Sequence, residues 1–102
     1  RERAALASAI TRQLRPHWTA PTGVDAEKLR SLVTWKLNPD GTLDGRPRCR
    51  NVASSVTVSN RPQSALHCER AIRAVQLAAP FNLPEPFYTR WKELEWEFNR
   101  RL

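Results

Sequence analysis

The stretch Leu37-Asn38-Pro39-Asp40-Gly41-Thr42-Leu43 separates two segments in which apolar and polar residues alternate. Pro39 has a fixed φ that suits the first position of a turn, and Gly41 can adopt a left-handed conformation without a steric penalty. Because the flanking segments alternate with the period of a β-strand, the stretch predicts a hairpin with a three-residue loop.

Both arms of this hairpin are predicted strands with one buried face. On the first arm, from Leu29 to Leu37, the inward side chains are expected to be Ser31, Val33, Trp35 and Leu37; on the second, Leu43, Gly45, Pro47 and Cys49. The loop predicts that these residues pair in the order Leu37–Leu43, Trp35–Gly45, Val33–Pro47 and Ser31–Cys49. Proline cannot donate a ladder hydrogen bond, so Pro47 favours an edge position for the second strand.

Two helices and a third strand complete the prediction. Leu6, Ile10 and Leu14 recur at helical spacing and end at Pro16. A second helix is expected from Pro62, capped by Asn60, to Pro80, and its expected apolar stripe is Ala65, Cys68, Ala71, Ile72, Val75 and Ala79. The final strand follows a short helical turn at Phe87–Trp91.

The resulting order is α-β-β-α-β, which predicts an α+β fold: a two-layer sandwich with a three-stranded antiparallel sheet and the helices on one face. The chain has 102 residues, of which 40% are hydrophobic. This length suits one domain, 1–102. The sequence starts with Arg1 and contains no methionine, so we expect it to be a fragment of a longer protein, with any anchoring segment upstream.

The chain is strongly basic, with 17 Lys and Arg against 10 Asp and Glu and a formal net charge of +7. Such a balance favours acidic partners. Arg46, Arg48 and Arg50 alternate along the second strand and predict a basic rim on the open face of the sheet. A nucleic-acid-binding module is one alternative, but the open face lacks the aromatic residues that stack on bases.

Catalysis has little support, because His17 and His67 lack a nearby triad pattern and three glycines form no phosphate loop. We therefore expect no enzyme activity, no cofactor and no small-molecule substrate. Cys49 and Cys68 leave three alternatives: a disulfide, two free thiols, or a zinc site with both histidines. The histidine and cysteine spacing matches no zinc finger or ribbon.

The final strand is the predicted partner-binding site, because it contains no proline or glycine and should form an open sheet edge. The second strand and a groove on the helix side are the alternative sites. An extended peptide can add to such an edge through main-chain hydrogen bonds. The residues of this edge are Glu93, Leu94, Glu95, Trp96, Glu97, Phe98 and Asn99.

Several ordered segments resemble the C-terminal domain of the TolA family, the Tol–Pal counterpart of TonB. They are Ile10–Trp18 followed by Pro21, Leu37–Leu43, Ser64–Leu66 leading into Arg70–Val75, and the tail Ala79–Pro84, Tyr88, Trp91–Lys92 and Trp96–Asn99. The resemblance implies strand order 2-1-3. A TonB-type domain that engages outer-membrane transporters is the nearer alternative.

The resemblance also implies a disulfide, because TolA domains often join the first strand to the second helix. Cys68 occupies the helix position, whereas Ser31 stands at the strand position; the predicted register places Cys49 beside it, so we expect a Cys49–Cys68 bond. Such a bond indicates an oxidising compartment. The implied function is a periplasmic protein-binding domain of an inner-membrane-anchored energy transducer, which couples the proton motive force to outer-membrane integrity.

The partners that the resemblance implies are a TolB-like periplasmic protein, which docks through its N-terminal segment, and Pal. Colicins and phage coat proteins exploit the same family, and a TolQ/TolR-like complex would act through the missing N-terminal region. No nucleic acid is expected among the partners.

Overall fold

The computed structural model describes residues 2–102 as three helices and one three-stranded antiparallel sheet. The helices are α1 (Glu2–Leu14), α2 (Ser64–Ala78) and α3 (Tyr88–Trp91), and the strands are β1 (Ser31–Lys36), β2 (Arg48–Asn51) and β3 (Glu93–Phe98). Single turns of 3-10 helix lie at Arg15–His17, Ala26–Lys28, Ala53–Ser55, Arg61–Gln63 and Glu85–Phe87. The predicted α+β fold is confirmed, with α3 as the expected short helical turn.

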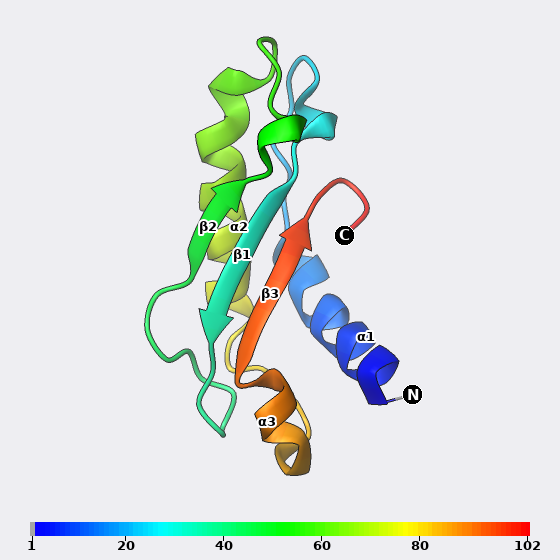
Figure 1. Ribbon diagram of the computed structural model, residues 1–102, viewed down its shortest axis with the longest axis vertical. Coiled ribbons are helices and arrows are strands. Elements are labelled where there is room, and N and C mark those ends of the chain that lie inside the picture. The colour runs from blue at the N-terminus through cyan, green and yellow to red at the C-terminus, as the bar shows by residue number, and fades with distance from the viewer. Residues whose placement is uncertain (1) are drawn as a thin grey trace.

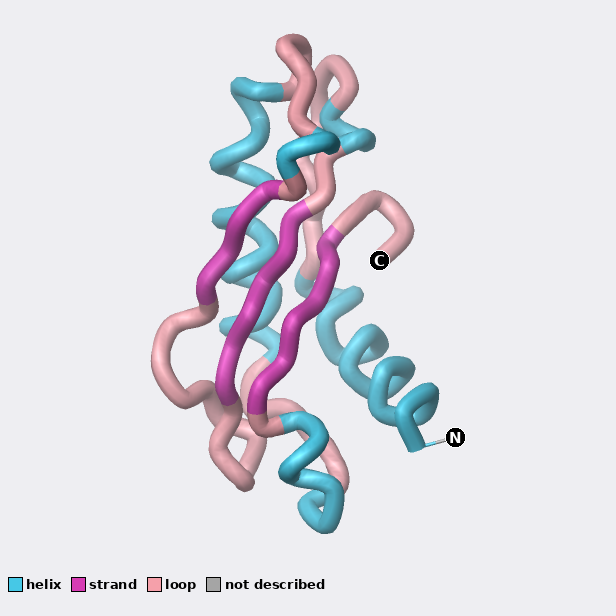
Figure 2. Tube along the Cα trace, viewed as in Figure 1, coloured by secondary structure: helices cyan, strands magenta, loops and turns pink. Residues whose placement is uncertain are grey.

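The molecule has two layers (Figure 1). In the sheet, β1 lies between β2 and β3, which confirms the predicted order. Helix α2 runs behind β2 and β1, and α1 runs obliquely beside and behind β3, so no helix of the described residues covers the other face of the sheet (Figure 2). No helix within residues 2–102 has the length and apolar character needed to cross a bilayer.

The core lies between the sheet and the helices, and its buried residues come from α1, α2, α3, β1, β3 and the loops beside them. Its buried members are Leu6, Ile10, Leu14, Val33, Trp35, Leu37, Ala71, Ala74, Val75, Phe81, Trp91 and Phe98. The inward alternation of β1 and the helical stripe of α1 are therefore confirmed, since both sets of side chains fill one interior.

The predicted turn is present. Asn38 N–H donates to Thr42 O at 2.8 Å, Gly41 N–H donates to Asn38 O at 2.9 Å, and Gly41 has a φ of 86°. The Phe81 N–H in turn donates to Gly41 O at 2.8 Å, and a Cβ at Gly41 would collide with the Phe81 carbonyl oxygen. The turn is thus both a local structure and a docking point for the segment after α2.

Beyond the turn, the predicted register is wrong by two residues. Leu37 pairs with Leu43 as predicted, but only as an isolated bridge, and Val33 then pairs with Cys49. Asp44 N–H still donates to Lys36 O at 2.9 Å, and residues 45–47 then leave the ladder, because Gly45 adopts a φ of 86° and Pro47 has no N–H to donate. A slip of two residues keeps every side chain on its predicted face, since the side-chain period of a strand is two.

Helix α2 is rotated from its predicted orientation. Ala65 is exposed, whereas His67 is buried beside Ala71, Ala74 and Val75. The predicted cap is also wrong, because the helix begins at Ser64 and the Asn60 side chain bonds to the preceding loop. The rotation gives His67 a polar partner on β1, Ser31, and such a partner cannot be recognised from sequence periodicity.

Candidate protein-docking edge

A disulfide joins the edge strand β2 to the helix layer. Cys49 and Cys68 lie 19 residues apart in sequence, with their Cα atoms 5.7 Å apart and a sulfur–sulfur distance of 2.07 Å. The predicted pairing is confirmed. Because Cys49 pairs with Val33 rather than Ser31, the bond lies one inward position further along the sheet than the predicted register placed it.

The opposite edge of the sheet is formed by β3, which within residues 2–102 has β1 as its single neighbouring strand. Leu37 N–H donates to Lys92 O at 2.9 Å, which sets the phase of the ladder. Since backbone groups alternate in direction along a strand, Leu94 and Trp96 direct theirs to β1, and the residues between them direct theirs outward.

The outward backbone groups belong to Glu93, Glu95 and Glu97. Within residues 2–102, these groups form no hydrogen bond to another element. Successive outward residues of a strand lie roughly 7 Å apart. The edge therefore offers donors and acceptors in the geometry of a missing fourth strand.

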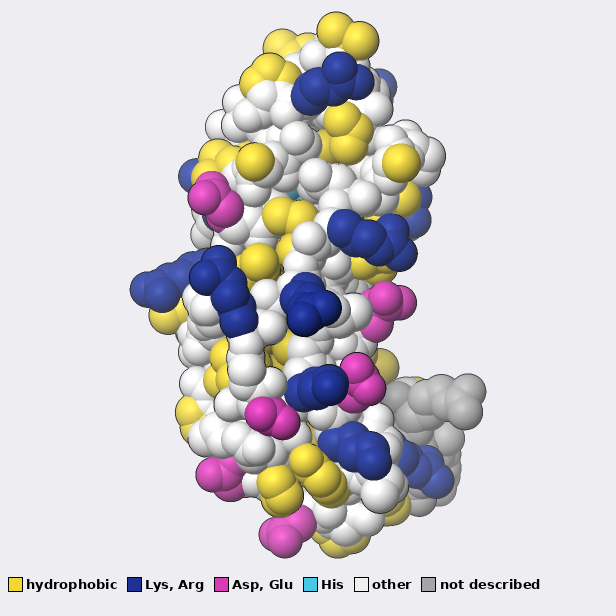
Figure 3. All heavy atoms as spheres, turned by 60° about the vertical axis from the view of Figure 1, so that its left-hand side comes forward, with side chains coloured by type: hydrophobic (Ala, Val, Ile, Leu, Met, Phe, Trp, Pro, Cys, Tyr) yellow, Lys and Arg dark blue, Asp and Glu magenta, His cyan; other side chains and the backbone are white. Residues whose placement is uncertain are grey.

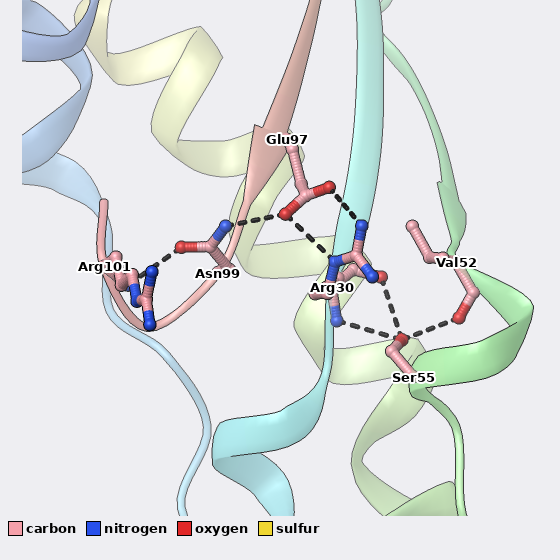
Figure 4. A network of polar contacts seen from close by, with 6 residues as sticks. All are labelled: Arg30, Val52, Ser55, Glu97, Asn99 and Arg101. Atoms are coloured by element: carbon pink, nitrogen blue, oxygen red, sulfur yellow. Dashed lines mark hydrogen bonds and ion pairs between the residues drawn. The ribbon is translucent and has the colours of Figure 1, made fainter.

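The three glutamate side chains of this edge lie on the open face and differ in their surroundings. Glu93 and Glu95 are exposed and, within the described chain, have no ionic partner. Glu97 accepts two hydrogen bonds from the Arg30 guanidinium, at 2.9 and 3.1 Å, and a third from Asn99 Nδ2 at 2.7 Å (Figure 4). The hydrogen bonds from Arg30 and Asn99 lower the pKa of the Glu97 carboxyl. Of the three, Glu93 and Glu95 thus form no ion pair within residues 2–102, and Lys36 stands opposite Glu93 in the β1–β3 ladder.

The Arg30–Glu97 pair belongs to a wider network that joins three segments. The Ser55 hydroxyl donates to Val52 O at 2.6 Å and accepts from Arg30 N–H at 3.0 Å, and Asn99 Oδ1 accepts from Arg101 N–H at 2.8 Å (Figure 4). This network ties the end of β3 to β1 and to the loop after β2.

The C-terminal end of the edge is closed by Trp18. Its indole Nε1–H donates to Asn99 O at 3.0 Å, and its ring packs edge-on against Phe98 with 5.1 Å between centroids. Phe98 is fully buried. Of the predicted site residues, Phe98 and Asn99 therefore hold β3 in place, and the accessible part of the edge is 93–97.

An apolar groove runs along the other side of this edge, between β3 and α1. It has a volume of about 450 Å³ and is lined by Leu6, Ala7, Ile10, Arg90, Trp91, Leu94 and Trp96. Leu94 and Trp96 are half-buried. A helix-side groove was an alternative site, but the α1 stripe was predicted as core alone, so its residues were not assigned to a groove.

The predicted basic rim lies on the far side of the open face. Arg48 and Arg50 project from β2, while Arg46 lies in the preceding loop rather than on the strand as predicted. All three are exposed, and within the described chain none forms an ion pair. In Figure 3, which brings the β2 side of the molecule forward, dark-blue Lys and Arg side chains are spread over the face with magenta Asp and Glu among them.

The comparisons of this chain with known proteins gave no relative. No family model, no curated protein and no solved structure matches it. The relationship to the TolA family therefore stays a prediction from the sequence motifs.

Proposed function

We propose that this chain is the periplasmic docking domain of a TolA-like energy transducer, and that it binds the N-terminal segment of a TolB-like protein by strand addition to β3. The observation that carries the proposal is the outward, unpaired backbone of Glu93, Glu95 and Glu97. Main-chain hydrogen bonds to an open edge supply affinity for an extended peptide.

The contrast between the two sheet edges supports this choice. Strand β2 has four residues, follows Pro47 and is bonded to α2 through Cys49. Strand β3 has six residues without proline or glycine. Short strands and prolines limit edge pairing, so β3 is the better template.

The disulfide is consistent with the oxidising periplasm, where structural disulfides persist. In the proposed role, a membrane-anchored region of the same transducer transmits the proton motive force, and this domain carries the connection to outer-membrane partners, with Pal, colicins and phage coat proteins as further ligands.

The test is chemical-shift mapping on the isotope-labelled chain titrated with the N-terminal peptide of a TolB-type protein. We expect the largest perturbations at the backbone amides of 93–97. Peptides from the TonB box of outer-membrane transporters form the comparison; tighter binding of these would assign the domain to the TonB type instead.

A peptide series methylated on single backbone nitrogens provides the control for strand addition. Methylation should abolish binding at one alternating set of positions and leave the other set unaffected, because only one set faces β3. Perturbations confined to α1 and α2, or equal sensitivity at all positions, would rule out docking at this edge.

A further inference from the structure

The two sides of the β3 edge differ in chemistry, and we infer from this difference the pattern of the strand that docks there: basic residues opposite Glu93 and Glu95, alternating with apolar residues that enter the groove beside α1. The occupant is an extended segment of a partner protein. This inference rests on the proposed docking at β3.

The register of strand pairing determines which side each ligand residue faces. A residue directly opposite Glu95 projects onto the same face as Glu95, and its two neighbours project onto the face of Leu94 and Trp96. A docked strand must therefore alternate between the open face and the groove.

On the open face, the ligand meets negative charge. Glu93 and Glu95 are exposed and have no ionic partner within residues 2–102, whereas Glu97 is already bonded to Arg30. Opposite charges on directly paired residues stabilise a strand pair, and like charges destabilise it. Lysine or arginine is thus favoured opposite Glu93 and Glu95.

On the other face, the ligand meets the apolar groove. Leu6 and Ile10 of α1 form one wall, and Leu94 and Trp96 of β3 form the other. Side chains of valine, leucine or isoleucine size would cover the half-buried Leu94 and Trp96 and remove apolar surface from water. Arg90 at one end of the groove lies over the Phe87 ring, with 5.6 Å between its Cζ and the ring centroid.

The same charges disfavour a second copy of the chain as the occupant. Antiparallel pairing of two β3 strands about Glu95 would place glutamate opposite glutamate along the shared edge. Such like-charged pairs destabilise a strand pair. Pairing of two copies through this edge is therefore unfavourable, and pairing with a basic, alternating segment is favoured.

The test uses the whole chain with a test strand fused after Leu102 through a flexible Gly/Ser linker, which raises the effective concentration to the order of millimolar. Three test strands are compared: Ser-Lys-Val-Lys-Val-Lys-Ser, the acidic Ser-Glu-Val-Glu-Val-Glu-Ser, and the out-of-phase Ser-Lys-Lys-Val-Val-Lys-Ser. The readout is hydrogen exchange of the outward amides of Glu93, Glu95 and Glu97.

We expect the basic alternating strand to slow exchange at these three amides roughly tenfold or more relative to the unfused chain. Replacing lysine by glutamate, or breaking the alternation, should reduce that protection about three- to tenfold, as expected for the loss of cross-strand pairs. The variant Glu95→Lys should shift the preference towards the acidic strand.

The matched control is Glu69→Lys, which makes the same charge change at an exposed position of α2 and should leave the preference unchanged. Equal protection by the acidic and basic strands would overturn the inferred pattern while leaving the docking edge intact. Absence of protection with all three strands would overturn both. Protection already present in an unfused dimer would identify a second copy as the occupant and overturn the inference.

Discussion

His67 Nδ1 lies 2.6 Å from the Ser31 hydroxyl oxygen, inside the interface between α2 and the sheet. The same Ser31 Oγ accepts a hydrogen bond from Asn51 Nδ2 at 3.0 Å, so the hydroxyl joins the side chains of His67 and Asn51. His67 is 1% exposed, and its ring packs edge-on against Trp18 with 5.0 Å between centroids. A neutral imidazole is therefore built into the core beside the disulfide.

The stability of the fold should fall on acidification because of His67. Burial lowers the pKa of His67 to about 4 in the folded chain, from an ordinary value of 6.5. Between pH 6.5 and 4 the unfolded chain thus binds a proton at His67 that the folded chain excludes. The contribution of the neutral His67 to the free energy of unfolding is therefore complete above pH 6.5 and is lost as the pH falls towards 4. The free energy of unfolding, measured with urea, should fall by roughly 2–3 kcal/mol between pH 7 and pH 4.5.

The variant His67→Gln should show a much weaker pH dependence over this range, because it has no imidazole to protonate. His17→Gln is the matched control, since His17 is exposed, and it should retain the dependence of the parent chain. An unchanged pH profile in His67→Gln would show that another group is responsible.

Reduction of the Cys49–Cys68 bond should destabilise the fold without changing its topology. The bond closes a loop across 19 residues of separation. In the chain-entropy account, such a loop is worth on the order of 3 kcal/mol. Urea unfolding with and without a thiol reductant measures the effect, and the double variant Cys49→Ser/Cys68→Ser should match the reduced chain. Identical unfolding midpoints in both conditions would contradict this prediction.

Substitution at Gly41 should cost more than the same substitution at Gly45. Both glycines have a φ of 86°, so alanine meets the same backbone strain at each, about 1–3 kcal/mol. At Gly41 the new Cβ also collides with the Phe81 carbonyl oxygen, whereas at Gly45 it meets no atom within 4 Å. The difference in the free energy of unfolding between Gly41→Ala and Gly45→Ala isolates the contact with Phe81. Equal values for the two variants would show that this contact does not contribute to stability.

Replacement of Asn60 should be among the most damaging polar substitutions. Asn60 is fully buried; its Oδ1 accepts from Thr57 N–H at 2.7 Å, and its Nδ2 donates to Asp25 O at 2.9 Å and Ser55 O at 3.0 Å. Alanine would leave these groups without partners, at a cost of about 2–4 kcal/mol measured by thermal or urea unfolding.

Asn82→Ala serves as the control for Asn60, because Asn82 is exposed and bonds to Gln13 only through its backbone. Asn82→Ala should change the free energy of unfolding by no more than about 0.5 kcal/mol. Comparable losses in the two variants would show that the buried network of Asn60 contributes little.

Local rules were sufficient for the turn, for β1 and β3, and for the charge of the proposed docking edge. The turn at Pro39 and Gly41, the inward set of β1 and the alternation of Glu93, Glu95 and Glu97 depend on backbone preference and side-chain period, which neighbouring residues determine. The Cys49–Cys68 bond was also expected, although its predicted register was wrong. The two-residue slip preserved the face of Cys49, and so the error did not change which cysteines could meet.

Other features depend on contacts between distant segments, and these were decided by the tertiary structure. The groove beside β3 exists because α1 crosses the sheet obliquely, His67 is buried because Ser31 offers it a hydrogen bond, and Glu97 is neutralised by Arg30. None of these contacts has a local signal, since each joins residues more than 30 positions apart. The sequence alone thus determined the elements and the polarity of the edge, and packing determined which of its charges remain available to a partner.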